Sequence, residues 1–126
     1  MKQIEIKAAI ENLIDTFLYA GKVSIELRKK GLIKEIKEDN TPVSNGDLEV
    51  NRILTEKINN LTPQIPIVSE ETSHNKSKKD LKNFWLIDPI DGTYDYINDL
   101  DEFTLNAGLI INNRAVAGII LSLIHI

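Results

Sequence analysis

Trp85-Leu86-Ile87-Asp88-Pro89-Ile90-Asp91-Gly92-Thr93 joins an apolar run to two carboxylates, a glycine and a hydroxyl. Residues 84–87 are apolar and aromatic, which predicts a buried strand that leads directly into the carboxylates. Two carboxylates so close together repel each other unless a cation lies between them. If the short helix predicted over residues 92–98 begins at the glycine, its first amides can point at an anion. A metal beside such amides is what phosphoryl transfer requires.

The same stretch has a simpler interpretation. Asp-Pro and Asp-Gly are common turn pairs, so these residues could serve only to reverse the chain. The spacing alone does not decide between a site and a turn.

Two polar clusters upstream carry the same ambiguity. Val68-Ser69-Glu70-Glu71 places adjacent acids at the end of an apolar strand, where they suit a metal ligand or a general base. Taken alone, a solvated loop is the better interpretation. Lys37-Glu38-Asp39-Asn40-Thr41-Pro42-Val43-Ser44-Asn45-Gly46-Asp47 contains Ser44 and Asp47 at the spacing of a helix capping box, so Asp47 could act only as a cap.

The rest of the chain predicts an α+β fold. Apolar periodicity predicts one amphipathic helix over residues 4 to about 29 and a second from about 44 to 60. Shorter patterns predict strands over residues 32–37, 65–68, 84–87, 103–111 and 115–123, a loop over 38–46 and a lysine-rich loop over 72–82. Asn112-Asn113 tolerates the left-handed backbone of a hairpin turn. Two helices followed mostly by strands indicate a layered domain.

Composition narrows the function classes. The chain has 126 residues, 15 basic and 19 acidic side chains and a net charge of −4, which suits one globular domain without a basic surface for nucleic acid or anionic membranes. Cysteine is absent, which excludes disulfides, thiolate metal sites and a cysteine nucleophile. The two histidines, His74 and His125, are far apart in sequence. Any metal would therefore be held mainly by oxygen, and Mg²⁺ is the expected ion.

The sequence shows no targeting segment. The first five residues already carry charge and lack an apolar signal core. The most apolar stretch, residues 115–126, is too short to cross a bilayer. We therefore expect a cytoplasmic protein with no stable membrane insertion and no nucleic-acid polymer as partner.

Read together and in order, the three clusters resemble the motifs of the inositol monophosphatase superfamily of metal-dependent phosphatases. The residues from Leu61 to Glu71 and Glu102-Phe103-Thr104-Leu105-Asn106 are similar to those of its bacterial CysQ branch, the 3′(2′),5′-bisphosphate nucleotidases. The resemblance implies a layered α/β sandwich of the sugar phosphatase type, with two long helices on a mainly antiparallel sheet. It also implies a Mg²⁺-dependent phosphomonoesterase that converts adenosine 3′,5′-bisphosphate to AMP. The alternatives are an inositol monophosphatase and a truncated, non-catalytic metal-binding fragment.

The resemblance assigns roles position by position. Four residues match metal ligands, with Asp88 bridging two ions and Ile90 contributing its backbone carbonyl: Glu70, Asp88, Ile90 and Asp91. Three residues match the catalytic set that holds and orients the attacking water, namely Glu70, Thr93 and Asp47, the last by hydrogen bonding to the threonine. The amides of Gly92 and Thr93 match the phosphate cradle.

The resemblance also has departures. Family members are about twice as long, so residues 1–126 are expected to form an N-terminal metal-binding lobe, truncated at the C-terminus. Tyr94-Asp95-Tyr96 stands where the branch usually has Lys-Glu-Phe, which bears on the choice among small phosphorylated substrates. Gly46 replaces a usual alanine, a change expected to matter little. Homodimers occur in the family, and the sequence neither requires nor excludes one here.

Overall fold

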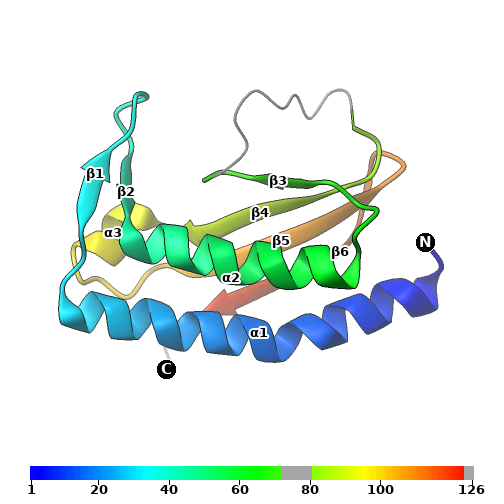
Figure 1. The fold of residues 1–126 in the computed structure, drawn as a ribbon, viewed down its shortest axis with the longest axis horizontal. Helices are drawn as coiled ribbons and strands as arrows, with labels where there is room; N and C mark the ends of the chain where they lie inside the picture. The colour runs from blue at the N-terminus through cyan, green and yellow to red at the C-terminus, as the bar shows by residue number, and fades with distance from the viewer. Residues whose placement is uncertain (72–80, 124–126) are drawn as a thin grey trace.

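Two long helices cover one face of a four-stranded sheet in the computed structural model, which describes residues 1–71 and 81–123. The helices are α1 (Gln3–Lys30), α2 (Asn45–Leu61) and the short α3 (Thr93–Ile97). The strands are β1 (Lys34–Ile36), β2 (Pro42–Ser44), β3 (Ile67–Ser69), β4 (Phe84–Asp91), β5 (Thr104–Ile111) and β6 (Arg114–Ser122). α1 and α2 run side by side along the sheet, and a small β1-β2 hairpin lies at one end of the molecule (Figure 1).

The sheet has the order β3-β4-β5-β6. β3 pairs with β4 in parallel, while the β4-β5 and β5-β6 pairs are antiparallel. The predicted α+β class with two long helices on a mainly antiparallel sheet is therefore confirmed.

The core lies between the helices and this sheet. Leu13 and Phe17 of α1 and Leu54 and Ile58 of α2 are four residues apart in each helix, so each pair faces the sheet, and all four are fully buried. Trp85 of β4 is equally buried, and its indole Nε1 donates a hydrogen bond to Thr62 Oγ1 at 3.0 Å. Because a buried indole N–H requires a partner, Thr62 fixes the end of α2 against β4.

Most predicted elements occur where the sequence placed them. Both long helices, the strands and the short helix at residue 93 are confirmed, and Asn112 and Asn113 have the positive φ angles expected of the hairpin turn, 52° and 64°. The prediction of an uninterrupted loop over residues 38–46 is wrong, because residues 42–44 form β2 and pair with β1. Residues 72–80 of the predicted lysine-rich loop, together with His74 and His125, lie outside the described residues.

The second face of the sheet carries no helix within the described ranges. Leu86, Gly118 and Ile120 lie on this face, and Ile120 is 73% exposed. Among the described residues, no helix combines the length and the apolar content needed to cross a membrane.

Candidate active site

A bulge in β4 brings two of the predicted site residues onto the same face of the sheet. Asp88 pairs with Asn106 and Asp91 pairs with Thr104, so three steps along β4 match two steps along β5. Without the extra residue, Asp88 and Asp91 would point to opposite faces, because side chains alternate along a strand. Pro89 lies within the irregular segment, where its missing N–H costs no ladder hydrogen bond. The bulge therefore gathers both carboxylates at the carboxyl end of β4.

Asp88 lies in an unusual electrostatic environment. Its Oδ1 is buried and has no hydrogen-bond partner among the described residues. Burial, together with the neighbouring negative charges of Glu70, Asp91 and Glu71, raises the pKa of Asp88 to about 7. A carboxylate with these surroundings is stabilised either by a proton or by a cation.

The end of β3 brings Glu70 to the same place. The backbone amide of Glu70 donates to the carbonyl of Ile87 at 3.1 Å, which continues the parallel pairing of β3 with β4. Because parallel strands end at the same edge of a sheet, Glu70 lies beside Asp88. The side chain of the next residue, Glu71, is almost fully buried, and burial raises its pKa. The Lys37 ammonium pairs with this carboxylate at 3.7 Å.

Asp47 and Thr93 are joined by a hydrogen bond across the molecule. Thr93 Oγ1 donates to Asp47 Oδ1 at 2.8 Å and lies 3.2 Å from the carbonyl oxygen of Ile90. The other oxygen, Asp47 Oδ2, accepts from the backbone N–H and the hydroxyl of Ser44, at 2.9 and 2.5 Å. The capping box is thus present, and Asp47 acts both as a cap and as the partner of Thr93.

Gly92 is required by the backbone at the start of α3. Its φ angle is +92°, a left-handed conformation that glycine adopts without strain. A Cβ at this position would also lie 2.8 Å from the carbonyl oxygen of Glu102. A substitution at Gly92 would therefore displace either α3 or the segment that leads into β5.

The residues gathered here fit a hard cation. The carboxylates of Glu70, Asp88 and Asp91 and the carbonyl of Ile90 are all oxygen donors, which Mg²⁺ prefers. The buried, unpartnered Oδ1 of Asp88 is the observation that favours a cation, because a buried charge without a partner is costly. Within residues 1–71 and 81–123, no group of three or more His, Asp or Glu side chains is already drawn together as a metal cluster. The case for a cation therefore depends on the oxygen donors present and on the buried Oδ1 of Asp88.

The raised pKa of Asp88 predicts how stability varies with pH in chelator-treated protein. The folded state holds the Asp88 proton more tightly than the unfolded chain, in which an aspartate titrates near 4. The stabilisation from protonation is complete below pH 4 and is lost as the pH rises through about 7. We expect the melting temperature to fall between pH 5 and pH 8, as measured by circular dichroism with EDTA present. Asp88→Asn should flatten this dependence, and equal slopes in the two proteins would refute the assignment.

Two positioning contacts were not predicted from the sequence. Asn51 is buried in α2, and its Oδ1 accepts a 2.5 Å hydrogen bond from the Ser69 hydroxyl at the end of β3. Asn51 lies one helical turn after Asp47, so the two side chains share a helix face. A polar asparagine on that face was the sequence feature that could have indicated this contact. Lys37 belongs to the upstream cluster, but only the fold shows its contact with Glu71.

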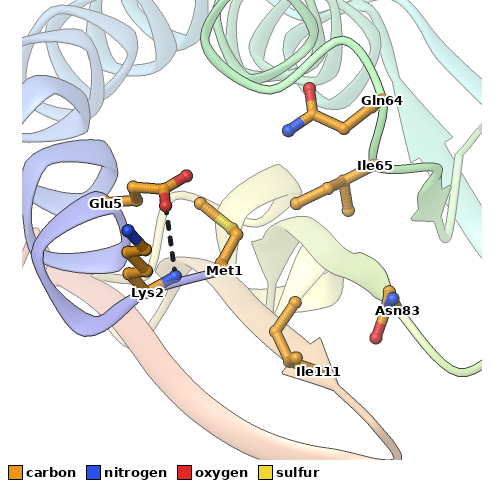
Figure 2. A pocket seen from close by; sticks show the side chains of 7 residues that line it. All are labelled: Met1, Lys2, Glu5, Gln64, Ile65, Asn83 and Ile111. Carbon is orange, nitrogen blue, oxygen red and sulfur yellow. Dashed lines mark hydrogen bonds between the residues drawn. The ribbon is translucent and has the colours of Figure 1, made fainter.

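A cavity of about 490 Å³ adjoins the candidate site. It begins at Asp91 and Gly92 and is bordered further along by Asp101, Glu102, Phe103, Thr104 and Ser122. A second cavity, of about 500 Å³, lies around the amino-terminal end of α1, between Met1, Lys2 and Glu5 on one side and Ile65, Asn83 and Ile111 on the other (Figure 2). This cavity contains none of the predicted site residues, which lie at the other end of β4.

Comparison with proteins of known sequence gives consistent matches. The profile of the inositol monophosphatase family matches residues 6–125. A 3′(2′),5′-bisphosphate nucleotidase CysQ of Haemophilus influenzae is 42% identical over 103 residues, which are 80% of this chain and 38% of the relative. The CysQ of Aggregatibacter actinomycetemcomitans is 38% identical over 113 residues, 88% of this chain and 42% of the relative. The chain thus spans about two fifths of the length of these curated relatives.

Solved structures match over nearly the whole chain. The extragenic suppressor protein suhB of Bartonella henselae has a TM-score of 0.78 at 23% identity and covers 93% of this chain and 45% of its own. An IMPase/NADP phosphatase solved with NADP and Ca²⁺ has a TM-score of 0.81 at 17% identity, with coverages of 99% and 47%. Another structure of an IMPase/NADP phosphatase contains Mg²⁺ and phosphate and has a TM-score of 0.77 at 19% identity, with coverages of 92% and 44%. At these identities the likeness shows the fold alone, and the expected sugar phosphatase type of fold is confirmed.

Proposed function

The chain belongs to the inositol monophosphatase family, and on that premise we propose that it forms the metal-binding lobe of a Mg²⁺-dependent phosphomonoesterase. The proposed reaction is hydrolysis of the 3′-phosphate of adenosine 3′,5′-bisphosphate, which consumes one water and yields AMP and phosphate. The proposal is carried by the hydrogen bond from Thr93 to Asp47 together with the buried Oδ1 of Asp88, which has no hydrogen-bond partner among the described residues.

Four residues are proposed as metal ligands: Glu70, Asp88, Asp91 and the carbonyl of Ile90. Bound Mg²⁺ would neutralise the substrate phosphate and make a water more acidic. Asp88 supports this assignment because its charge, buried among other carboxylates, is stabilised by a cation. The same acidic cluster would repel an anionic substrate without the metal, so we expect activity to require it.

Thr93 is proposed to orient the attacking water. Its proton is committed to Asp47 at 2.8 Å, so the lone pairs of its oxygen are free to accept a hydrogen bond from that water. Asp47 in turn is fixed by Ser44, which prevents the pair from rotating. Glu70 is the proposed second group that holds the water. A water held between Thr93 and Glu70 would be oriented for in-line attack on phosphorus.

The amides of Gly92 and Thr93 are proposed to hold the phosphate. Gly92, in a left-handed conformation, is the N-cap of α3 immediately after Asp91, so these two amides belong to the first N–H groups of the helix, which have no partner within it. Backbone amides at such a turn provide positive partial charge for phosphate oxygens.

The nucleotide substrate is the finer part of the proposal. Its support is the identity of up to 42% with relatives named 3′(2′),5′-bisphosphate nucleotidase CysQ. We propose in addition that the protein acts in the cytoplasm on small phosphorylated substrates and not on nucleic-acid polymers, either as a monomer or as a homodimer. Inositol 1-phosphate hydrolysis and metal binding without turnover are the two alternatives that the assay below separates.

Substitution of Asp91 tests the proposal directly. Phosphate release from adenosine 3′,5′-bisphosphate and from inositol 1-phosphate is measured with and without Mg²⁺. We expect Asp91→Asn to lower the turnover of the preferred substrate by about 100-fold, since a metal contributes several kcal/mol to transition-state stabilisation.

The matched control is Asp15→Asn, the same change at an exposed position in α1. It should leave turnover unaltered. Full activity in Asp91→Asn would eliminate the site assignment, a preference for inositol 1-phosphate would favour the first alternative, and Mg²⁺ binding without turnover would favour the second.

A further inference from the structure

Tyr96 occupies the space that a side chain at position 46 would fill. Gly46 is the second residue of α2, and a Cβ built on it would overlap the hydroxyl oxygen of Tyr96 and lie 2.7 Å from ring carbons Cε2 and Cζ. The described glycines with positive φ are Gly31 and Gly92, so backbone conformation does not explain glycine at position 46. Glycine also weakens a helix relative to alanine. The contact with Tyr96 therefore accounts for glycine at position 46.

The Tyr96 side chain is held from several sides. It is fully buried, and its hydroxyl donates a 2.7 Å hydrogen bond to the backbone carbonyl of Ser24 in α1. The Arg28 guanidinium lies 5.6 Å from the Tyr96 ring centroid and 5.0 Å from that of Phe103, and the two rings pack with centroids 4.9 Å apart. Burial raises the pKa of Tyr96 further above neutrality, so the hydroxyl remains a donor. The Tyr96 side chain is therefore held in a fixed position against the start of α2.

The short helix α3 touches the start of α2 at two points. At one point Thr93 donates to Asp47, and at the other, three residues along α3, Tyr96 is seated against Gly46. The residues contacted on α2 are adjacent in sequence. A change in the second contact must therefore move the first.

We propose that Tyr96 is a positioning residue that acts through Gly46. Its buried ring, packed against Gly46, fixes the start of α2 and thereby holds Asp47 at hydrogen-bond distance from Thr93. The catalytic consequence depends on the proposed function, whereas the geometric consequence does not.

The test compares the wild-type chain with Gly46→Ala, Tyr96→Phe and the double variant. We expect Gly46→Ala to shift the NMR resonance of the Thr93 methyl group and to lower kcat at least tenfold, with KM changed less than threefold. Adding Tyr96→Phe removes both the overlapping hydroxyl and its anchor on the Ser24 carbonyl, so the ring carbons that would lie 2.7 Å from the new Cβ are able to move away. The Thr93 resonance should then return toward its wild-type position, and kcat should recover at least fivefold. Tyr96→Phe alone should lower kcat by no more than about threefold.

The matched control is Gly118→Ala in β6, where a Cβ would meet its nearest neighbour at an ordinary 3.6 Å. It should leave both the Thr93 resonance and kcat unchanged. An unaltered Thr93 resonance in Gly46→Ala, or no recovery in the double variant, would overturn the proposal. If Gly46→Ala fails to fold, a folded double variant supports the proposed contact between Tyr96 and Gly46. A double variant that also fails to fold refutes it. If the wild-type protein shows no turnover, the proposed function fails, and the resonances alone decide the positioning role.

Discussion

Asp88→Asn is expected to abolish Mg²⁺-dependent turnover almost completely, by about 1,000-fold or more, while making the metal-free protein more stable. The loss of turnover would follow from the proposed role of Asp88 as a metal ligand, because a bound metal would contribute several kcal/mol to transition-state stabilisation. The gain in stability follows from the environment of Asp88, whose buried charge is opposed by Glu70, Asp91 and Glu71. Asparagine has nearly the same shape and no charge.

Opposite effects on activity and stability separate a functional carboxylate from a structural one. A carboxylate that held the fold together would lose stability on the same substitution. The measurements are calorimetric Mg²⁺ titration, phosphate release and thermal unfolding at pH 7.5 with EDTA. Asp15→Asn is again the matched control, and it should change none of the three. A less stable Asp88→Asn, or one that binds Mg²⁺ as tightly as the wild type, would contradict the assignment.

The helices and most of the strands could be predicted because local patterns specify them. Apolar residues four apart, such as Leu13 with Phe17 and Leu54 with Ile58, identify the buried helix faces without any knowledge of the partner. The exception, β2, lies in a segment rich in turn formers and is a strand only because residues 34–36 lie beside it. Its identity depends on tertiary pairing rather than on local propensity.

The sequence indicated which residues form the candidate site, but not the contacts between them. Asp47 illustrates the limit: the capping box and the partnership with Thr93 were competing interpretations in the sequence, and the structure realises both, one with each carboxylate oxygen. Asp47 and Thr93 are 46 positions apart, so no local pattern could report their contact. The bulge at Pro89 and the close approach of the Tyr96 side chain to Gly46 likewise arise from tertiary packing.

Thr93→Val should lower turnover by about 1,000-fold, within the range of roughly 10²–10⁴ that a group handling the reacting proton contributes. Valine has the shape of threonine but neither donates to Asp47 nor accepts from a water. It also leaves Asp47 Oδ1 buried without its 2.8 Å donor, at a cost of about 1–3 kcal/mol of folding free energy. Urea unfolding measures that cost separately from kcat.

Thr93→Ser decides between a chemical and a steric role for this residue. Serine keeps the hydroxyl and loses only the methyl group, so turnover within about fivefold of wild type is expected, and the stability lost in Thr93→Val should largely return. A role in packing alone predicts the reverse order, because valine fills the space of threonine and serine does not. The hydroxyl donates to Asp47, the residue that caps α2, and lies 3.2 Å from the carbonyl oxygen of Ile90 within the bulge. Turnover that follows the hydroxyl rather than the methyl group would therefore tie catalysis to the hydrogen bond between Thr93 and Asp47.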